Sequence, residues 1–114
     1  MKIVKDQLKI SEIEEMAKKM HGDFVKAIVD IEKKIMAVDA PLHADLFELL
    51  IREENSEPQY LWGINFHPDK TGEDFIEFDS MMNIKPSLGN RTRGIENEEI
   101  KNKIIEIVNE LVKK

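Results

Sequence analysis

Apolar residues recur at helical spacing in two segments of the chain, one near each end. In the first segment, Ser11 and Glu14 fit a capping box, a pairing that satisfies free backbone N–H groups at the start of a helix. Gly22 follows at a place suited to a left-handed cap. The face between them carries Ile13, Met16, Ala17 and Met20. We therefore predict a helix over residues 11–21.

The second helical segment lies near the carboxyl end. Asn97 can cap it, and Glu98 and Glu99 suit the positive end of a helix dipole. Its apolar stripe consists of Ile100, Ile104, Ile107, Val108 and Leu111. This pattern predicts a helix over residues 97–112.

Alternating apolar positions predict strands between the two helices. Residues 24–39 are dense in β-branched side chains, so we interpret them as two strands joined by a tight polar turn at residues 32–34, although a helical stripe also fits part of this segment. Residues 60–66 alternate clearly. Shorter strands are expected at residues 1–4, 75–78 and 81–84, and irregular structure at residues 86–94.

Residues 42–53 fit two kinds of element. Their odd-numbered and even-numbered positions can be read as the two faces of a strand, whereas one apolar stripe would suit a helix, namely Leu46, Phe47, Leu50 and Ile51. We interpret the segment as a strand, because the turn-forming residues 53–58 would join it to residues 60–66 in a hairpin.

These elements together predict an α+β fold. We expect a two-layer sandwich, in which the helices at residues 11–21 and 97–112 cover one face of a mostly antiparallel sheet of about five to seven strands. The length of 114 residues suits a single domain, so residues 1–114 are treated as one unit.

The composition excludes several chemistries. Cysteine is absent, which excludes disulfides, zinc–thiolate sites and a cysteine nucleophile. Small secreted domains often need disulfides, and residues 1–6 lack the apolar core of a signal peptide, so we expect a cytoplasmic protein. No apolar run approaches the length of a membrane span, and no membrane partner is expected. The formal net charge of −6 argues against nucleic acid as a partner, because binding requires lysine and arginine to neutralise phosphates.

One polar segment stands out as a positive region in this acidic chain. Residues 87–94 hold two of the three arginines, Arg91 and Arg93, and precede the predicted final helix. Guanidinium groups match carboxylate or phosphate, so our hypothesis is an anion-binding loop. Its predicted ligand-binding residues are Ser87, Asn90, Arg91, Thr92 and Arg93. The alternative is that both arginines pair with neighbouring acids and tie the loop to the sheet.

A second candidate site comprises His43, Asp45 and His67. Residues two apart on a strand share a face, so His43 and Asp45 would point the same way, and the predicted hairpin could bring His67 beside them. Such a set could bind a divalent metal and support a metal-assisted hydrolase. The alternative is that these histidines form hydrogen bonds with nearby carboxylates and bind no metal.

The strand predicted at residues 60–66 contains two further polar or small residues. A glycine inside a strand, here Gly63, marks a bulge or the close approach of another segment or a ligand. Asn65 lies on the face opposite Trp62 and could join a polar site. For all three residues, a role in the sheet is the simpler interpretation.

Three functions follow as hypotheses. The first is a binding module for a small anionic ligand or an acidic peptide. The second is the metal-assisted hydrolase, and the third is a homodimer formed through an edge strand. We favour the binding module, and we expect no catalytic residue and no cofactor.

Several sequence blocks together resemble a small prokaryotic family of uncharacterised proteins. The blocks are HAD at residues 43–45, LWGIN at 61–65, FIEFDS at 75–80, NIKPS at 83–87 and GNRTRG at 89–94. The resemblance covers nearly the whole chain. It implies a stand-alone domain of this size, and it implies no activity, substrate or cofactor.

Overall fold

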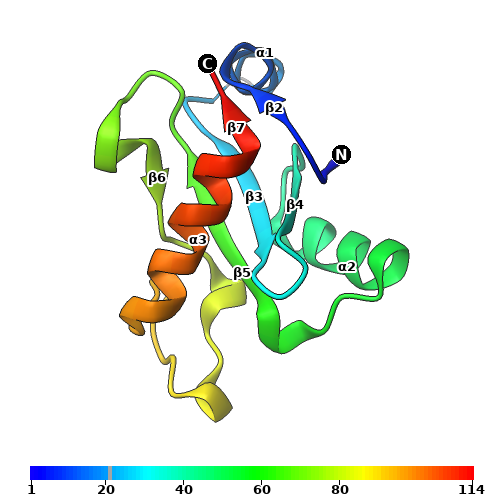
Figure 1. Ribbon diagram of the computed structural model, residues 1–114, viewed down its shortest axis with the longest axis vertical. Helices are drawn as coiled ribbons and strands as arrows, with labels where there is room; N and C mark the ends of the chain where they lie inside the picture. The colour runs from blue at the N-terminus through cyan, green and yellow to red at the C-terminus, as the bar shows by residue number, and fades with distance from the viewer. Residues whose placement is uncertain (21) are drawn as a thin grey trace.

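A five-stranded sheet forms the centre of the computed structural model, which describes residues 1–20 and 22–114 (Figure 1). The strand order is β1-β4-β3-β5-β6, and all neighbours are antiparallel. A second, two-stranded sheet pairs a segment before the first helix with the end of the chain. The strands are β1 (Lys2–Val4), β2 (Leu8–Lys9), β3 (Val25–Asp30), β4 (Ile35–Val38), β5 (Leu61–Phe66), β6 (Ile76–Glu77) and β7 (Val112–Lys113).

Three α-helices accompany the sheets: α1 (Ile10–Lys19), α2 (His43–Glu54) and α3 (Glu98–Leu111). Short 3₁₀ turns lie in the connections, namely η1 (Pro58–Tyr60), η2 (Gly72–Phe75), η3 (Met81–Asn83) and η4 (Pro86–Leu88). The predicted α+β class with a mostly antiparallel sheet is therefore confirmed. Within the described part of the chain, every helix is too short or too polar to cross a lipid bilayer.

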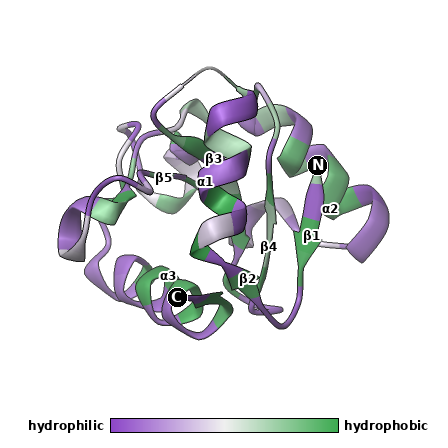
Figure 2. Ribbon diagram, turned by 90° about the horizontal axis from the view of Figure 1, so that it is seen from above, coloured by the Kyte–Doolittle hydropathy of each residue, from purple (hydrophilic) through white to green (hydrophobic). Residues whose placement is uncertain are grey.

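Each face of the central sheet has its own apolar cluster. Because successive side chains of a strand point to opposite faces, β3 sends Ala27 and Val29 to one face and Ile28 to the other. The first face packs against residues of α1 and α3, and the second packs against Leu46 and Leu50 of α2. Figure 2 shows α2 and α3 on opposite sides of the strands. The sheet thus has helices on both faces, whereas we had expected them on one.

The strand predicted at residues 42–53 was wrong, because this segment forms α2. The helical stripe decided the outcome, since Leu46 and Leu50 are buried against the sheet. Asn55 ends the helix in the left-handed conformation, and its N–H donates to the carbonyl of Leu50. The expected hairpin with residues 60–66 is therefore replaced by a helix that returns to the sheet.

The two predicted helices are confirmed with small changes. Asn97 caps α3 as predicted, because its Oδ1 accepts the N–H of Ile100 at 3.1 Å. The first helix begins at Ile10, so Ser11 lies inside it, and Glu12 instead of Glu14 accepts a backbone N–H, that of Lys9 at 2.8 Å. The helix ends at Lys19, and the predicted end at His21 lies outside the described residues.

The predicted turn between residues 24–31 and 35–39 is also confirmed. Many tight hairpin turns contain an Asn-Gly pair, and here a buried carboxylate stabilises the turn instead. Oδ1 of Asp30 accepts the N–H groups of Glu32 (2.9 Å) and Lys33 (3.0 Å). Its Oδ2 accepts the hydroxyl of Ser56 at 2.7 Å. Lys34 completes the turn with φ 58°. The local hydrogen bonds of Asp30 thus stabilise the reversal between β3 and β4.

Residues 81–84, predicted as a strand, form the 3₁₀ turn η3 and the residue after it. The strand β6 is correspondingly short and pairs only with Asn65 and Phe66 of β5. The other end of β5 therefore has no strand on that side, and the segment from Ser80 to Glu96 lies there instead.

Candidate functional site

Asn83 takes the place of a neighbouring strand on the side of β5 opposite β3, beyond the short pairing with β6. Its Oδ1 accepts the N–H of Gly63 at 2.7 Å, and its Nδ2 donates to the carbonyl of Gly63 at 2.9 Å. The same Nδ2 donates to the carbonyl of Arg93 at 3.0 Å. Asn83 is fully buried. One carboxamide therefore satisfies both backbone groups of Gly63 and holds the segment around Arg93 against β5.

Asn90 holds the other end of the same loop. Its Nδ2 lies within hydrogen-bond distance of the carbonyls of Asn83 (2.7 Å), Thr92 (3.2 Å) and Gly94 (2.8 Å). Its Oδ1 accepts the N–H of Glu96 at 2.8 Å. Residues 80–96 have little regular secondary structure, so these two buried asparagines supply the hydrogen bonds that a helix or sheet would otherwise make.

Gly63 allows the loop to approach the sheet closely. A Cβ at this position would lie 2.5 Å from both Cβ and Oγ of Ser80, and 3.4 Å from Cδ2 of His43. Ser80 is buried, and its Oγ accepts the N–H of Met82 at 3.1 Å. The close approach expected for a glycine in this strand is therefore confirmed, with Ser80 as the neighbour.

His43 is the first residue of α2 and lies over the end of β5. Its Nε2 is 2.8 Å from the carbonyl of Ile64, and because a carbonyl only accepts, Nε2 carries the proton in the neutral ring. Burial lowers the pKa of His43, and the positive charges of Lys26 and Arg93 act in the same direction. The hydrogen bond to Ile64 and the charge of Asp79 oppose this change in pKa. The lowered pKa thus favours the neutral form of His43, although charged groups lie around it.

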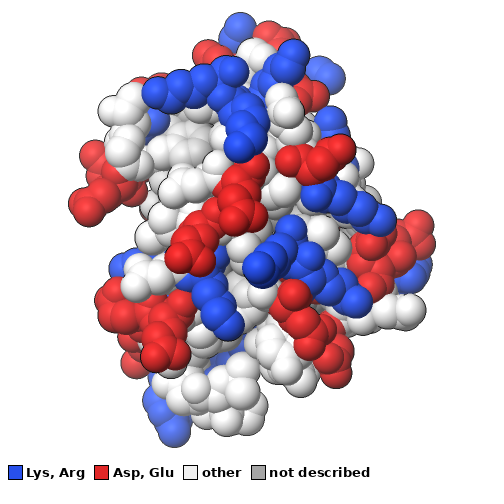
Figure 3. Space-filling model, in the orientation of Figure 1, with Lys and Arg blue, Asp and Glu red and all other residues white. Residues whose placement is uncertain are grey.

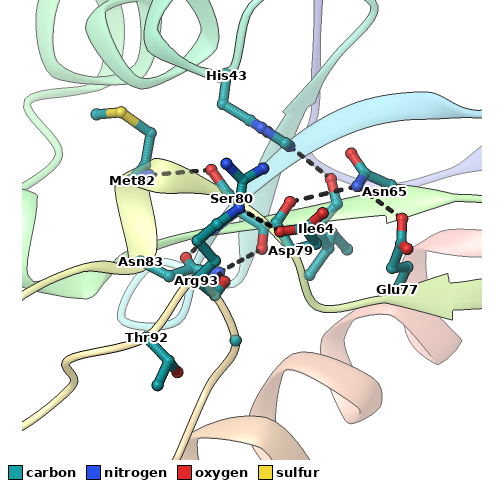
Figure 4. Close-up of polar contacts among 12 residues, drawn as sticks. His43, Ile64, Asn65, Glu77, Asp79, Ser80, Met82, Asn83, Thr92 and Arg93 are labelled. Atoms are coloured by element: carbon teal, nitrogen blue, oxygen red, sulfur yellow. Dashed lines mark hydrogen bonds and ion pairs between the residues drawn. The ribbon is translucent and has the colours of Figure 1, made fainter.

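Asn65 has one side-chain atom without a partner among the described residues. Its Nδ2 donates to Oε1 of Glu77 at 2.9 Å and to the carbonyl of Asp79 at 3.3 Å, which fixes the orientation of the carboxamide. Oδ1 is then a buried acceptor that receives no hydrogen bond from the residues that the structure describes, and Asn65 as a whole is 3% exposed. In Figure 4 this oxygen faces the side of β5 on which His43 lies.

Arg93 brings a guanidinium group to the same place. Its Nε donates to Oδ1 of Asp79 at 2.6 Å, and this hydrogen bond raises the pKa of Arg93. Its two terminal nitrogens make no hydrogen bond with the described residues. In Figure 4 the side chains of Arg93, His43 and Asn65 converge around the carbonyl of Ile64. We call His43, Asn65, Asp79 and Arg93 the β5-end cluster.

The pH dependence of stability should report on His43. Because burial lowers its pKa in the folded state, the unfolded chain binds more protons between the two pKa values, and stability should fall as the pH falls below about 6.5. His43→Gln keeps a donor for Ile64 and removes the titration. Urea unfolding at several pH values should show a flatter dependence for this variant between about pH 5 and pH 7. An equal change of unfolding free energy with pH in the wild-type protein and in His43→Gln would contradict the assignment of this pH dependence to His43.

The lowered pKa of Glu77 acts in a different pH range. Hydrogen bonds from Asn65, first, and from His67 lower the pKa of this carboxylate. The stability that ionised Glu77 adds is fully present when the pH is above the usual pKa of glutamate, about 4.3. It is lost as the pH falls below that value. Experiments above about pH 5 therefore separate His43 from Glu77.

The residues predicted for the anion-binding loop differ in what surrounds them. Ser87, Arg91 and Thr92 are exposed. The backbone N–H of Arg91 donates to Glu96 at 2.6 Å, and its guanidinium forms no ion pair with the described residues. Asn90 is buried, and its carboxamide is fully used within the loop. Arg93 is paired with Asp79, so the alternative that both arginines pair with neighbouring acids holds for Arg93 and not for Arg91 among the described residues.

The predicted metal site is not assembled in the described part of the chain. Because His43 and Asp45 lie on a helix, they point about 200° apart around its axis. The prediction that they share one face of a strand was therefore wrong. His67 lies beside Glu77, with Nε2 at 3.1 Å from its Oε1, which is the carboxylate contact expected for a histidine without metal. Among the described residues, no group of three histidine, aspartate or glutamate side chains could hold a metal ion.

Comparisons with known proteins give a family and no activity. A model of the family described as "Protein of unknown function (DUF5674)" matches residues 2–111. This span includes all the sequence blocks that resembled a family of uncharacterised proteins. No curated protein and no solved structure matches the chain.

Proposed function

The chain belongs to the DUF5674 family of proteins of unknown function, and from the geometry of its β5-end cluster we propose that it is a binding module for a small anionic ligand. The anion contacts Arg93, and a hydroxyl or N–H group of the same ligand donates to Oδ1 of Asn65. The supporting observation is that Oδ1 of Asn65 is buried and receives no hydrogen bond from residues 1–20 and 22–114. Buried acceptors in native proteins nearly always have a partner, and a ligand can supply one.

The charges around the cluster favour an anion. The terminal nitrogens of Arg93 have no hydrogen-bond partner in the described part of the chain, so they can make the paired hydrogen bonds that carboxylate and phosphate accept. Lys26 pairs with Asn65 across β3 and β5, so its side chain is on the same face of the sheet. The amino end of α2 adds a partial positive charge, since His43 is its first residue and no side chain caps it. Asp79 opposes these groups and holds Arg93 in place.

The two requirements together define a ligand class. The ligand carries a carboxylate or phosphate for Arg93 and a hydrogen-bond donor within reach of Asn65. Phosphate at neutral pH fits, because it keeps at least one O–H group. Sulfate has a similar size and charge but carries no proton, so it would leave Oδ1 of Asn65 without a donor.

Inorganic phosphate is therefore the first probe. Arg93→Gln should weaken phosphate binding by about tenfold or more, because a charge-assisted hydrogen bond is lost. Arg91→Gln is the matched control, since this arginine belongs to the same loop, and it should change the affinity by less than about twofold. Calorimetry and the rise of the melting temperature with phosphate concentration measure both variants.

Two results would overturn this proposal. One is equal phosphate affinity in the wild-type protein and Arg93→Gln. The other is a loss of binding in Arg91→Gln as large as in Arg93→Gln, which would move the anion to the exposed tip of the loop. Sulfate provides a further check, because it should bind wild-type protein about tenfold more weakly than phosphate.

A further inference from the structure

The loop beside Arg93 carries no acidic residue. Residues 80–95 contain no aspartate or glutamate, in a chain that has 23 of them, and they include Lys85, Arg91 and Arg93. The same loop exposes three large apolar side chains: Met81 is 62% exposed, Ile84 38% and Leu88 51%. Figure 3 shows largely uncharged surface at the lower end of the molecule, where η4 lies, with Lys or Arg atoms beside it. We call Met81, Ile84 and Leu88 the apolar loop surface.

The apolar and the basic residues belong to two segments that lie side by side. The N–H of Ser80 donates to the carbonyl of Arg93 at 3.0 Å. Further along, Lys85 and Asn90 exchange two backbone hydrogen bonds of 2.7 and 3.1 Å. The loop is thus a closed hairpin-like segment with its tip at η4. The apolar loop surface and the two arginines therefore belong to one short closed segment, and their side chains are exposed on it.

Lys85 does not contribute a free charge to this surface. Its Nζ donates to the carbonyl of Met82 at 2.9 Å. It also lies 5.2 Å from the centre of the Phe47 ring and 5.1 Å from that of Trp62. These contacts connect the loop to α2 and β5 and keep the ammonium group partly buried. The basic groups available to a partner are Arg91 and Arg93.

The loop is also ordered before any partner binds. Asn83 and Asn90 fix its backbone from inside, through the hydrogen bonds described above. A surface that is already ordered loses little conformational entropy on binding, which raises the affinity of a small interface. Three apolar side chains beside two arginines thus suit a short peptide segment better than a large obligate interface.

We propose that residues 80–95 bind an acidic segment of a partner protein. Apolar side chains of that segment contact Met81, Ile84 and Leu88, and one of its carboxylates takes the anion position on Arg93. The choice of an acidic partner follows from charge complementarity. Asp79 pairs with Nε of Arg93, and Glu96 accepts only the backbone N–H of Arg91. The guanidinium of Arg91 and the terminal nitrogens of Arg93 thus have no acidic partner among the described residues. This inference rests on the anion site proposed above and names the source of the anion.

Two synthetic peptides of equal length test this inference on the full chain. One combines glutamate with leucine and phenylalanine, and the other has lysine in place of each glutamate. In amide NMR spectra, the acidic peptide should shift the signals of residues 80–95 in a saturable way, and the basic peptide should not. The double variant Met81→Ser, Leu88→Ser should weaken acidic-peptide binding by about fivefold or more, because apolar contact area is lost. Met20→Ser, on a distant exposed methionine, is the control and should leave it unchanged.

The same variants separate this inference from the anion site. The double variant should bind inorganic phosphate like the wild-type protein, whereas Arg93→Gln should lose both phosphate and the acidic peptide. If phosphate binds as proposed but neither peptide shifts residues 80–95, the peptide inference is wrong and the anion site stands. Equal binding of both peptides would also overturn it. So would a dimer in light scattering that the double variant Met81→Ser, Leu88→Ser converts to a monomer, because the apolar loop surface would then join two copies of this chain.

Discussion

Replacing Gly63 by alanine is expected to lower the free energy of unfolding by about 3 kcal/mol. The new Cβ would lie 2.5 Å from Cβ and Oγ of Ser80, a distance that packed atoms do not tolerate. Ser80 cannot move away easily, because its backbone hydrogen bonds join it to Arg93 and Asn83. The melting temperature should fall by roughly 10 °C or more.

A glycine control and a second-site variant make this prediction specific. Gly22→Ala should change stability by less than about 1 kcal/mol, because the nearest atom to its added Cβ is 3.9 Å away and its φ is not positive. In a background carrying Ser80→Gly, Gly63→Ala should cost much less than in the wild-type protein. Additive effects of the two substitutions would contradict a direct contact between these residues.

Replacing Asn83 by alanine should destabilise the protein by a similar amount, about 3 kcal/mol. The substitution leaves the N–H and carbonyl of Gly63 and the carbonyl of Arg93 without the hydrogen bonds that Asn83 supplies. Asn83 itself is fully buried, so water replaces those hydrogen bonds poorly. Chemical unfolding of Asn83→Ala gives the change in free energy.

Asn109→Ala is the matched control for this variant. Asn109 is an exposed asparagine on α3, and alanine should be neutral or slightly stabilising there because of its higher helix propensity. If Asn83→Ala lowers the free energy of unfolding by less than about 1 kcal/mol, the carboxamide of Asn83 does not take the place of a neighbouring strand. Retained phosphate binding in such a variant would also show that Arg93 does not need Asn83 for its position.

The final helix could be predicted because its signals are local. Asn97 caps the helix by accepting the N–H of Ile100, which is only three residues further along the chain. The apolar stripe repeats over the whole length of the helix. The segment that forms α2 was harder, since its apolar residues suit a strand as well as a helix. What decides it is contact with distant residues, as α2 packs against β3 and β4 and buries Leu46 and Leu50 there. Tertiary packing of this kind is not visible in the periodicity of a short segment.

The candidate site was predictable only in part. The excess of positive charge around Arg91 and Arg93 and the possible role of Asn65 are visible in composition and strand alternation. The role of Asn83 is not, because its partner Gly63 lies 20 residues away and is contacted through backbone atoms that any residue would offer. The same holds for His43, whose hydrogen bond is to the carbonyl of Ile64, 21 residues away. A pattern of residue types cannot reveal a side chain that binds distant backbone.

Binding of an anion between Arg93 and Asn65 is best tested by NMR of the side-chain N–H groups during a titration with inorganic phosphate. Our account predicts that the signals of the Asn65 carboxamide and of the Arg93 Nε–H shift together and saturate at one phosphate concentration, while those of Arg91 change little. Sulfate should shift the signal of Arg93 with a much smaller effect on Asn65. Unchanged Asn65 and Arg93 signals at phosphate concentrations that raise the melting temperature would contradict the proposed site.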